Sequence, residues 1–481
     1  MNKKPRLVQK FGGTSVGTPD RILSVIEIVR SFSEDNDVVV VVSALTPKVK
    51  SEGTTSLLLE SAAAAVGNGD FQTPLDNIRD HHLETLFQIG ATDRYTDETR
   101  IFIERTIVGL EQFLEAISVI KEVSPRTHDA IVSVGELLSA RLLATGLPIG
   151  GVRASYVDLS QICSKRYDEP TPGFWKDVRN RIDKLLEPQI EDDLVPVISG
   201  FLGPVPGGII DAVGRGYTDH TAALSAAAVG AKELQIWKEV DGVFSANPDV
   251  VPGAAILDSL SPEEASEITY FGSEVIHPMT MERAIDAGIP LRVKNTFQPG
   301  LPGTVISNSK APTPFHSPIR CVTSKNGIVM LNVRSNRMFH AHGFLAKLFD
   351  IMERHATVVD LVTTSEVSVS MTIDESENLE PLIADLATVG EVTVRSGMSI
   401  ASVVGKGMKG TVGLAAKIFG CLAEEDINIE MIGQGASKIN VSCVIEGSHA
   451  DRAVRALHKE FIEAGVTKER EQDRKALALS R

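Results

Sequence analysis

Hydrophobic positions in the N-terminal part of the chain switch between helical spacing and short unbroken runs. Residues 20–32 place Ile22, Val25 and Val29 on one face of a helix. The next apolar segment, 38–42, is five consecutive valines. A β-branched run without alternation is typical of a strand buried on both faces of a sheet. The pattern therefore predicts a helix followed by a buried strand, as at the start of a layered α/β domain.

The same switching continues as far as residue 306. A strand-like run, Ala130 to Ser133, precedes Gly135 and Glu136, which are expected to open a helix. The other expected helices are 55–65, parts of the charged region 76–120, and 137–144. Further buried strands are expected at 7–8, 151–157, 195–198, 233–236 and 290–293. With helices between the strands, residues 1–306 are predicted to form one three-layer α/β/α domain.

A change of composition marks the end of that domain. Residues 307–319 carry three prolines among small polar residues, which is typical of a linker. Beyond it a β-α-β-β pattern occurs twice, and this indicates two small ferredoxin-like units with the order βαββαβ. The predicted segments are a linker at 307–319, ferredoxin-like domains at 320–396 and 397–466, and a charged C-terminal tail at 467–481.

Charge and composition exclude several classes of protein. The 48 Lys and Arg against 63 Asp and Glu give a net charge of −15, which disfavours nucleic acid or an anionic membrane as partner. The longest aliphatic run, Val38 to Val42, is too short to span a bilayer, and we expect no signal segment before residue 7. The four cysteines lie far apart, so we expect reduced thiols rather than a disulfide framework or a zinc site. These features predict a cytoplasmic protein.

The first candidate for chemistry is residues 10–15 (KFGGTS), which follow the strand at 7–8. Gly12 and Gly13 let the backbone approach a ligand closely and point N–H groups at phosphate oxygens. Lys10 adds a positive charge at the same place. Adjacent glycines after a strand also form ordinary tight turns, so this pattern alone leaves both interpretations open.

The second candidate is residues 214–221 (GRGYTDHT), which precede the alanine-rich helix 222–229. Glycines, hydroxyls and a helix N-terminus form an anion site, and Arg215 can bind a carboxylate with two parallel hydrogen bonds. Asp219 fits a simple helix cap. Beside Lys10 it could instead hold the ammonium in position for phosphoryl transfer, where positioning and charge neutralisation supply most of the catalysis.

Together, three ordered motifs carry a resemblance that spans nearly the whole chain. Residues 10–15, 214–219 (GRGYTD) and 271–278 (FGSEVIHP) resemble those of aspartate kinase in the amino-acid kinase family. The repeat after the linker resembles the paired ACT domains of that enzyme. Residues 237–242 (WKEVDG) are most similar to the fungal branch.

The resemblance assigns residues to two substrates. The ATP phosphates would contact Lys10, Gly12 and Gly13, with Lys10 and Asp219 as the catalytic pair. The rest of the nucleotide would contact Lys238, Glu239, Asp241, Phe244 and Val275. L-Aspartate would be held by Ser43, Thr55, Glu136 and Arg215, with Glu136 on the α-amino group and Arg215 on the α-carboxylate. Each of these residues also has a structural interpretation. Thr55 fits a helix cap, Ser43 fits a turn at the end of a strand, and Glu136 fits an acidic residue in the first turn of a helix.

The implied reaction is attack of the aspartate β-carboxylate on the γ-phosphorus of MgATP, the first step towards threonine, methionine and isoleucine, and in some organisms lysine. The carboxylate is already ionised at neutral pH, so no side-chain base is needed. Mg²⁺ comes with the nucleotide, and no residue is assigned as a metal ligand. His220 and His277 are accordingly interpreted as structural.

The ACT repeats imply feedback inhibition by an amino acid, expected to be L-threonine with L-lysine as the alternative. The effector would lie in the first repeat, at Met338, Gly343, Phe344, Leu345, Asp360, Thr364, Ser365 and Glu366. Asp360 would accept its α-amino group, and the start of the ACT helix its carboxylate. ACT units usually pair across subunits, so a homo-oligomer is expected.

The sequence departs from the family pattern at two positions, and three rival interpretations stay open. Asp249 stands where many members have arginine, and Glu274 where some have lysine, which puts both nucleotide contacts in doubt. Residues 405–410 (GKGMKG) match the GxGxxG pattern of a dinucleotide site, but the unit is too short for the sheet that site needs. A second rival is a non-catalytic amino-acid sensor. The third is a kinase for glutamate, carbamate or a nucleotide monophosphate.

Overall fold

The computed structural model describes residues 4–47, 49–90, 94–163, 167, 169–203, 205–209, 213–214, 216–272, 276–308, 317–334, 343–365, 367–376, 379–435 and 437–463. The chain forms two compact units, the first made of Met1–Val243, Asp258–Pro262 and Val275–Ser309. Their division at 309/310 falls within the expected linker, most of which lies outside the described residues, as does the expected tail at 467–481. Phe244–Leu257 and Glu263–Glu274 belong to the second unit, so the expected domain 1–306 is not one contiguous unit.

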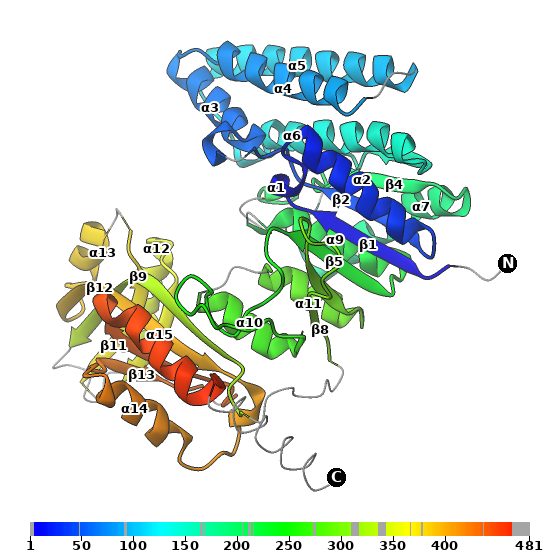
Figure 1. Cartoon of the computed structure of the whole chain (residues 1–481). Coiled ribbons are helices and arrows are strands. Elements are labelled where there is room, and N and C mark those ends of the chain that lie inside the picture. Colours follow the sequence, from blue (N-terminus) through cyan, green and yellow to red (C-terminus); the bar gives the residue numbers. More distant parts are fainter. Residues whose placement is uncertain are drawn as a thin grey trace, which may run out of the picture. The chain divides into compact units, whose positions relative to one another are not determined.

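An eight-stranded sheet forms the centre of the first unit, with the order β3-β4-β2-β1-β5-β7-β8-β6. Figure 1 labels β1, β2, β4, β5 and β8 of this sheet. Its strands are β1 (Arg6–Phe11), β2 (Asp37–Val42), β3 (Ala154–Val157), β4 (Val195–Ser199), β5 (Glu233–Lys238), β6 (Ser259–Leu260), β7 (Leu291–Asn295) and β8 (Thr304–Ile306). All pairs are parallel except β7 with β8. The predicted valine strand is confirmed as β2, where Val38 to Val42 are all buried. The parallel order places the carboxyl ends of β1, β2, β4 and β5 at one edge.

Helices cover both faces of this sheet. On one face α9 packs on β1, β2 and β5 and contacts α7 and α11, while on the other α2 and α6 pack on β2, and α6 also on β3 and β4. The helices of this unit are α1 (Gly13–Val16), α2 (Pro19–Ser33), α3 (Thr54–Gly67), α4 (Gln72–Gln88), α5 (Arg94–Ile120), α6 (Pro125–Gly146), α7 (Pro172–Glu191), α9 (Tyr217–Val229) and α11 (Pro278–Asp286). The unit also has two 3₁₀ turns, Lys50–Glu52 and Leu147–Gly150. The expected α/β/α layering is confirmed.

The expected strand at Ala130 to Ser133 is wrong, because these residues lie inside α6. Ser124 caps the helix by accepting a hydrogen bond from the Thr127 N–H at 3.2 Å. From Ile131 onward almost every residue of α6 is buried, and a helix that is apolar all round cannot be told from a buried strand by periodicity. Pro125–Gly150 is also long and apolar enough to cross a membrane, but 78% of the tested window is buried inside the fold, as in a core helix.

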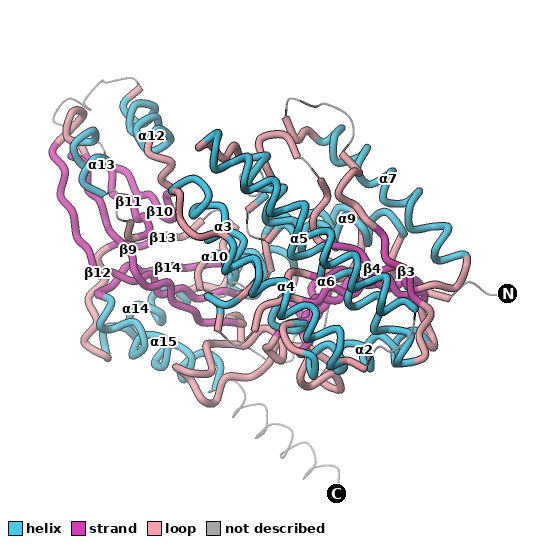
Figure 2. The backbone as a smooth tube through the Cα atoms, turned by 90° about the horizontal axis from the view of Figure 1, so that it is seen from above, coloured by secondary structure: helices cyan, strands magenta, loops and turns pink. Residues whose placement is uncertain are grey.

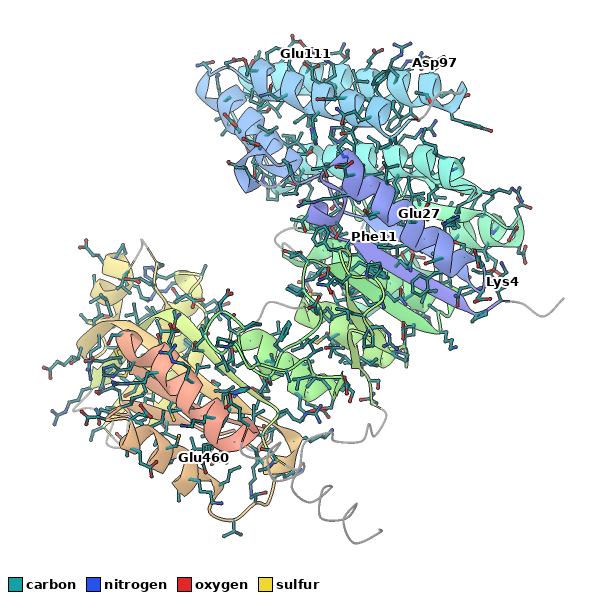
Figure 3. The ribbon with its side chains drawn as sticks, in the orientation of Figure 1. Lys4, Phe11, Glu27, Asp97, Glu111 and Glu460 are labelled. Carbon is teal, nitrogen blue, oxygen red and sulfur yellow. The ribbon has the colours of Figure 1, made fainter. Side chains whose placement is uncertain are left out.

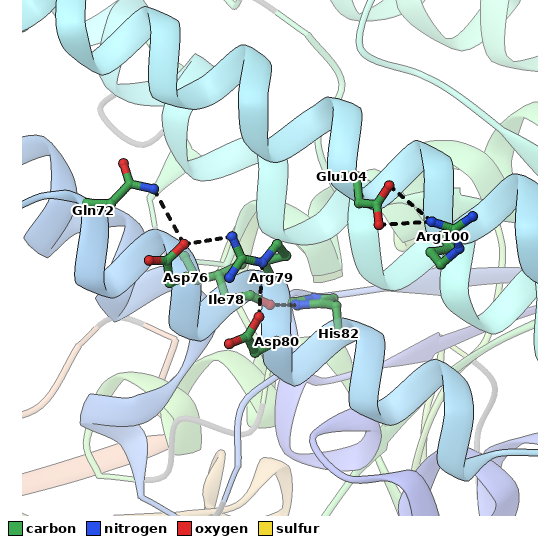
Figure 4. A network of polar contacts seen from close by, with 8 residues as sticks. All are labelled: Gln72, Asp76, Ile78, Arg79, Asp80, His82, Arg100 and Glu104. Carbon is green, nitrogen blue, oxygen red and sulfur yellow. Dashed lines mark hydrogen bonds and ion pairs between the residues drawn. The ribbon is translucent and has the colours of Figure 1, made fainter.

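Helices α3, α4 and α5 lie beyond α6, and α4 and α5 carry surface ion pairs away from the sheet. Figure 3 shows Phe11 on β1, whereas Glu27 and Asp97 point outward from α2 and α5. In the network of Figure 4, Arg79 contacts Asp76 at 2.7 Å. Exposed pairs of this kind contribute little to stability. His82 differs, because burial lowers its pKa to about 4 and its Nδ1 lies 2.7 Å from the Ile78 carbonyl, so the neutral ring donates that hydrogen bond.

The second unit contains a six-stranded sheet with the order β10-β11-β9-β12-β14-β13 (Figure 2). Its strands are β9 (Cys321–Arg334), β10 (Val359–Thr364), β11 (Ser368–Asp374), β12 (Glu391–Val404), β13 (Met431–Gly433) and β14 (Asn440–Glu446). Its helices are α10 (Pro262–Tyr270), α12 (Phe344–Arg354), α13 (Leu379–Leu386), α14 (Leu414–Glu424) and α15 (Ala450–His458), with short turns at Lys406–Met408, Gly447–His449 and Lys459–Glu463. Both β-α-β-β patterns are confirmed.

The two repeats are interlocked through the long strands β9 and β12. The second half of β9 pairs with β11 and with the first half of β12, whereas its first half, 321–325, pairs with residues 400–404 of β12. The second half of β12 also pairs with β14. Residues 321–325 therefore complete the sheet of the second repeat although they precede the first repeat in the chain. The sequence pattern did not predict this nesting.

Packing within the second unit accounts for the first two glycines of the GxGxxG match at 405–410. The Lys406 N–H already donates to the Glu264 carboxylate at 2.8 Å. A Cβ on Gly405 would lie 2.3 Å from the Pro318 carbonyl oxygen, and one on Gly407 would lie 2.8 Å from the Pro318 Cα. These glycines are needed for close packing of the backbone against Pro318.

Candidate active site

The predicted catalytic residues gather at the carboxyl edge of the first sheet, where ligands bind in open α/β folds. Lys10 is near the end of β1, Ser43 follows β2, Gly200 follows β4 and Lys238 ends β5. Asp219 lies in the first turn of α9, which packs beneath β1 and β5. Elements distant in the chain thus meet at one edge, where α9 packs on β1 and β5 (Figure 1).

Lys10 and Asp219 form a buried ion pair. The Lys10 Nζ lies 2.7 Å from the Asp219 Oδ1, and each side chain is 8% exposed. Burial alone would raise the pKa of Asp219, but the charges of Lys10 and Lys238 outweigh burial and lower it. The carboxylate therefore stays ionised and fixes the ammonium in place. The N-cap position of α9 is occupied by Gly216, so Asp219 is a residue of the first turn and not the cap.

The glycine loop lies directly beside the Lys10 ammonium. A Cβ on Gly12 would be 3.8 Å from the Lys10 Nζ, so the ammonium lies over the Gly12 backbone. Gly13 leaves no room for a side chain, since a Cβ there would lie 2.4 Å from the Thr46 Oγ1 and 2.5 Å from the Ala44 carbonyl oxygen. Any larger residue at this position would displace the loop. The arrangement places the Lys10 ammonium beside the backbone at the start of α1, while the Gly12 N–H itself donates to the Trp237 carbonyl at 3.4 Å.

Residues after β5 flank the same loop. The Glu239 carboxylate accepts a hydrogen bond from the Thr14 hydroxyl at 3.2 Å, and Asp241 accepts one from the Asn295 amide at 2.6 Å. Lys238 acts electrostatically on Asp219. Of the five residues expected at the nucleotide edge, Glu239 therefore contacts the glycine loop, Lys238 lies close enough to act on Asp219, and Asp241 contacts the end of β7.

The other two predicted nucleotide residues are not placed there. Phe244 belongs to the second compact unit, where it forms an isolated bridge with Ile256. Val275 lies outside the described residues, as does Glu274. Asp249 is exposed in the second unit, and its own N–H bonds to the Asn247 side chain at 3.0 Å in a local turn.

Glu136 forms the second polar centre of the edge. It is buried within α6, and its Oε1 accepts a hydrogen bond from the Thr218 hydroxyl at 2.7 Å. Burial raises the pKa of Glu136 to about 7, and hydrogen bonds from Thr218 and Tyr217 only partly oppose this. The other oxygen, Oε2, has no hydrogen-bond partner within the described part of the chain. A buried carboxylate with one open oxygen is suited to a ligand ammonium.

The surroundings of Glu136 bring in the remaining predicted aspartate residues. A Cβ on Gly135 would meet Ala44 and Thr54 at 2.9 Å, so α6 packs closely on the segment after β2 and on the start of α3. Ser139, one turn after Glu136, donates to the Ser43 carbonyl at 2.8 Å. Thr55 is the second residue of α3. Ser43, Thr55 and Glu136 therefore lie on adjoining segments, while Arg215 lies outside the described residues.

The structure adds contacts that the sequence did not reveal. The Thr218 hydroxyl bonds to Glu136, although the sequence motif assigns a role only to its neighbour Asp219. Gly200 is tightly enclosed, since a Cβ there would lie 2.6 Å from the Thr218 Oγ1 and 2.8 Å from the Glu136 Oε2. No periodicity links these positions, because they come from three separate elements. Their proximity to Asp219 in the GRGYTD motif was the available signal.

The predicted effector residues lie on α12, β10 and the turn after β10. Gly343, with φ of +87°, precedes α12, whose first residues are Phe344 and Leu345. Thr364 ends β10, and Ser365 in the following turn accepts N–H bonds from Val367 and Ser368. Met338 and Glu366 lie outside the described residues. Asp360 is paired with Lys325 at 2.8 Å. Over the described residues, no group of three or more His, Cys, Asp or Glu could hold a metal ion.

Known proteins show the same arrangement. A profile of the Amino acid kinase family matches residues 5–295, and a profile of the ACT domain matches residues 401–461. The aspartokinase of Candida albicans is 41% identical over 494 residues, which cover 95% of this chain and 90% of that protein. The chain belongs to the aspartate kinases of the amino acid kinase family.

Further aspartate kinases agree along the full length. The aspartokinase of Saccharomyces cerevisiae is 41% identical over 493 residues, which cover 95% of this chain and 92% of that protein, so fungal aspartokinases are similar along most of the chain. Among solved structures, E. coli aspartokinase III in complex with lysine and aspartate is 31% identical. It superposes with a TM-score of 0.77 over 95% of this chain and 99% of that one. The same enzyme with aspartate and ADP gives a TM-score of 0.76.

Proposed function

We propose that this aspartate kinase transfers the γ-phosphoryl group of MgATP to the β-carboxylate of L-aspartate, giving 4-phospho-L-aspartate and ADP. One observation carries the proposal: the buried Lys10–Asp219 pair lies over the Gly12 backbone at the sheet edge that also holds Glu136. A cation held this way stabilises charge on a transferring phosphoryl group. Further support comes from the similar E. coli aspartokinase III, which has been solved in complex with aspartate and ADP.

The chemistry requires positioning rather than a base. Asp219 holds the Lys10 ammonium, and the glycine loop supplies backbone N–H groups to the phosphates. Mg²⁺ is part of the nucleotide substrate and neutralises phosphate charge. The acceptor carboxylate is ionised at neutral pH, so it needs no proton acceptor. Burial lowers the pKa of His220 to about 3, which agrees with its interpretation as a structural residue.

Glu136 is proposed to hold the α-ammonium of aspartate through Oε2. The Thr218 hydroxyl fixes the orientation of the carboxylate through Oε1 at 2.7 Å. Gly200 keeps the space beside Oε2 open, since any side chain there would lie against this oxygen. Arg215, Ser43 and Thr55 are proposed to bind the rest of the substrate. An ammonium of the ligand would supply the charge that the buried carboxylate lacks.

The affinity for aspartate should depend on pH through Glu136. Its pKa of about 7 means that Glu136 becomes protonated as the pH falls below 7, and a neutral carboxyl binds an ammonium poorly. We expect the KM for aspartate to rise roughly tenfold from pH 8 to pH 6, since about nine-tenths of the sites are then protonated. Initial rates across this range test it. The KM of Glu136→Gln should be high and nearly flat with pH; a wild-type KM that does not change would contradict the assignment.

An acceptor panel tests the proposed substrate. Purified protein is incubated with MgATP and hydroxylamine plus L-aspartate, L-glutamate, carbamate or a nucleoside monophosphate, and ADP and hydroxamate are measured together. Aspartate should give both products in equal amounts. ADP release with another acceptor alone would assign a different substrate, and no ADP with any acceptor would favour the non-catalytic sensor.

Feedback inhibition is the second part of the proposal. We propose that an amino acid, L-threonine or alternatively L-lysine, binds the first repeat near the start of α12 and the turn after β10. Support comes from the paired repeats, the second of which matches the ACT domain profile at residues 401–461, and from E. coli aspartokinase III, which has been solved in complex with lysine and aspartate. Coupling between such sites is typically about 1–3 kcal/mol, so saturating effector should shift substrate affinity by roughly 5–150-fold.

Ser365→Phe should leave the kinase active and remove its sensitivity to the effector. A ring at this position would fill the proposed site beside Thr364. Ser365 also supports its turn by accepting N–H bonds from Val367 and Ser368, so Ser365→Ala is the matched control for loss of these bonds alone. Inhibition curves with threonine and lysine measure both variants. Full inhibition of Ser365→Phe, or equal resistance of Ser365→Ala, would show that the effector does not bind here.

Assembly and compartment complete the proposal. The first repeat exposes apolar side chains on and near α12 and β10: Leu345, Phe349, Val358, Val362 and Val367, which are 40–68% exposed. β10 is also an edge strand of its sheet. A homo-oligomer that pairs this region would cover them. The cysteines, Cys163, Cys321, Cys421 and Cys443, are all free thiols, which supports a reducing compartment such as the cytoplasm.

A further inference from the structure

Lys325 lies between two carboxylates in the first repeat. Its Nζ is 2.8 Å from the Asp360 Oδ1 and 2.7 Å from the Asp374 Oδ1. The same ammonium lies over the ring of Tyr270, 5.7 Å from its centroid. The three partners come from β10, the end of β11 and the end of α10. One cation is therefore shared by two anions and an aromatic ring.

The two carboxylates differ in their access to water. The Asp360 side chain is 2% exposed, whereas that of Asp374 is 64% exposed. The second oxygen of Asp360, Oδ2, is buried and has no hydrogen-bond partner within the described part of the chain. Burial raises the pKa of Asp360 against the stabilising contact with Lys325. The buried carboxylate therefore depends on Lys325, while the exposed one is also solvated.

Charge counting shows what the cluster lacks. Two carboxylates and one ammonium leave one negative charge, and Tyr270 adds none because burial and the nearby Asp360 raise its pKa above the ordinary value of 10. A second ammonium would neutralise the cluster. The Lys325 side chain is 22% exposed and has a flexible stem, so it can remain with Asp374 while another ammonium takes Asp360.

We propose that Lys325 and the α-ammonium of the effector exchange places on Asp360. In the described conformation Lys325 occupies Asp360, and on binding the effector takes this carboxylate while Lys325 stays with Asp374. The inference rests on the proposed feedback function and adds the residue with which the effector competes. The ligand class is an amino acid with a free α-ammonium.

The exchange also changes the contacts of α10. Tyr270 ends this helix, and the next residue, Phe271, packs with Ile328 and Ile400 and accepts a hydrogen bond from Thr323 at 3.1 Å. Gly272 has φ of +142°, and a Cβ there would lie 2.4 Å from the Thr323 Oγ1. The end of α10 is thus fixed to β9 on both sides of Lys325. Withdrawal of Lys325 from the Tyr270 ring alters the junction at the start of the FGSEVIHP motif.

The exchange predicts opposite effects for two charge-removing variants. Lys325→Met removes the competing cation, so effector should bind and inhibit at concentrations at least about threefold lower. Asp374→Asn removes the alternative partner of Lys325 and keeps it on Asp360, so about threefold more effector should be needed. Both variants should retain basal kinase activity. Lys417→Met, at an exposed position on α14, is the matched control and should not change.

The test measures calorimetric binding and inhibition with L-threonine and L-lysine on the full-length protein. If both variants bind the effector more weakly than the wild type, the cluster is only structural and the exchange is wrong. Unchanged effector binding by both variants would also contradict the exchange. Should Lys325→Met fail to fold, Lys325→Gln replaces it, because tighter effector binding on loss of the lysine charge is the result that only the exchange requires. If the wild type binds neither amino acid, both the proposed feedback regulation and the exchange are wrong. If the wild type is inhibited and both variants need the same effector concentration as the wild type, the exchange alone is wrong.

Discussion

Lys10→Met should reduce kcat by at least ~10²-fold, because it removes the cation held over the glycine loop where charge develops on the phosphoryl group. The KM values should change far less. Rates under saturating MgATP and aspartate measure the loss, and circular dichroism confirms that the protein is folded. Lys232→Met, at an exposed position just before β5, is the matched control and should retain full activity.

The same substitution leaves Asp219 buried without its partner. Removing one member of a buried pair typically costs about 3–5 kcal/mol, whereas removing both charges costs much less. The double variant Lys10→Met with Asp219→Asn should therefore regain stability without regaining activity. This separates catalysis from folding: a folded Lys10→Met protein with near-normal kcat would refute the catalytic role.

Glu136→Gln should raise the KM for aspartate by about 10²-fold while the KM for ATP stays within a few-fold. The amide keeps the shape and can still bond to Thr218, but it loses the charge that pairs with the substrate ammonium. Steady-state kinetics with each substrate varied in turn measure the two constants. Glu122→Gln, at an exposed position after α5, is the matched control.

A second substitution tests the same pocket from another element. A methyl group at Gly200 would lie 2.8 Å from the Glu136 Oε2, so Gly200→Ala should raise the same KM by steric obstruction. If Glu136→Gln raised the KM for ATP instead, the aspartate and nucleotide sites would be assigned the wrong way round.

Strong local patterns in the sequence predicted most of the fold. Val38 to Val42 could only be a strand buried on both faces, and the structure confirms it as β2. The prediction of a strand at Ala130 to Ser133 was wrong, because a helix buried on all sides has no polar face from which its period can be recognised. The nesting of the two ACT repeats and the transfer of Phe244–Leu257 to the second unit were beyond prediction, since both depend on long-range pairing.

The candidate site was predicted unevenly for a similar reason. Motifs located Lys10, Gly12, Glu136 and Asp219, and resemblance supplied their roles. The contact of Thr218 with Glu136 joins α9 to α6, 82 residues apart, and no local pattern encodes it. The exposed Asp374 beside buried Asp360 is likewise visible only once β10 and β11 are paired.

One experiment tests most directly whether the Lys10–Asp219 centre phosphorylates aspartate. Enzyme in excess over [γ-³²P]ATP is mixed with L-aspartate and Mg²⁺, and the reaction is quenched into hydroxylamine. The wild type should transfer the label to an acid-labile acyl phosphate and yield one β-aspartyl hydroxamate per ADP, and folded Lys10→Met should yield almost none in the same time. ADP and free phosphate without aspartyl hydroxamate, or equal yields from both proteins, would contradict the proposed function.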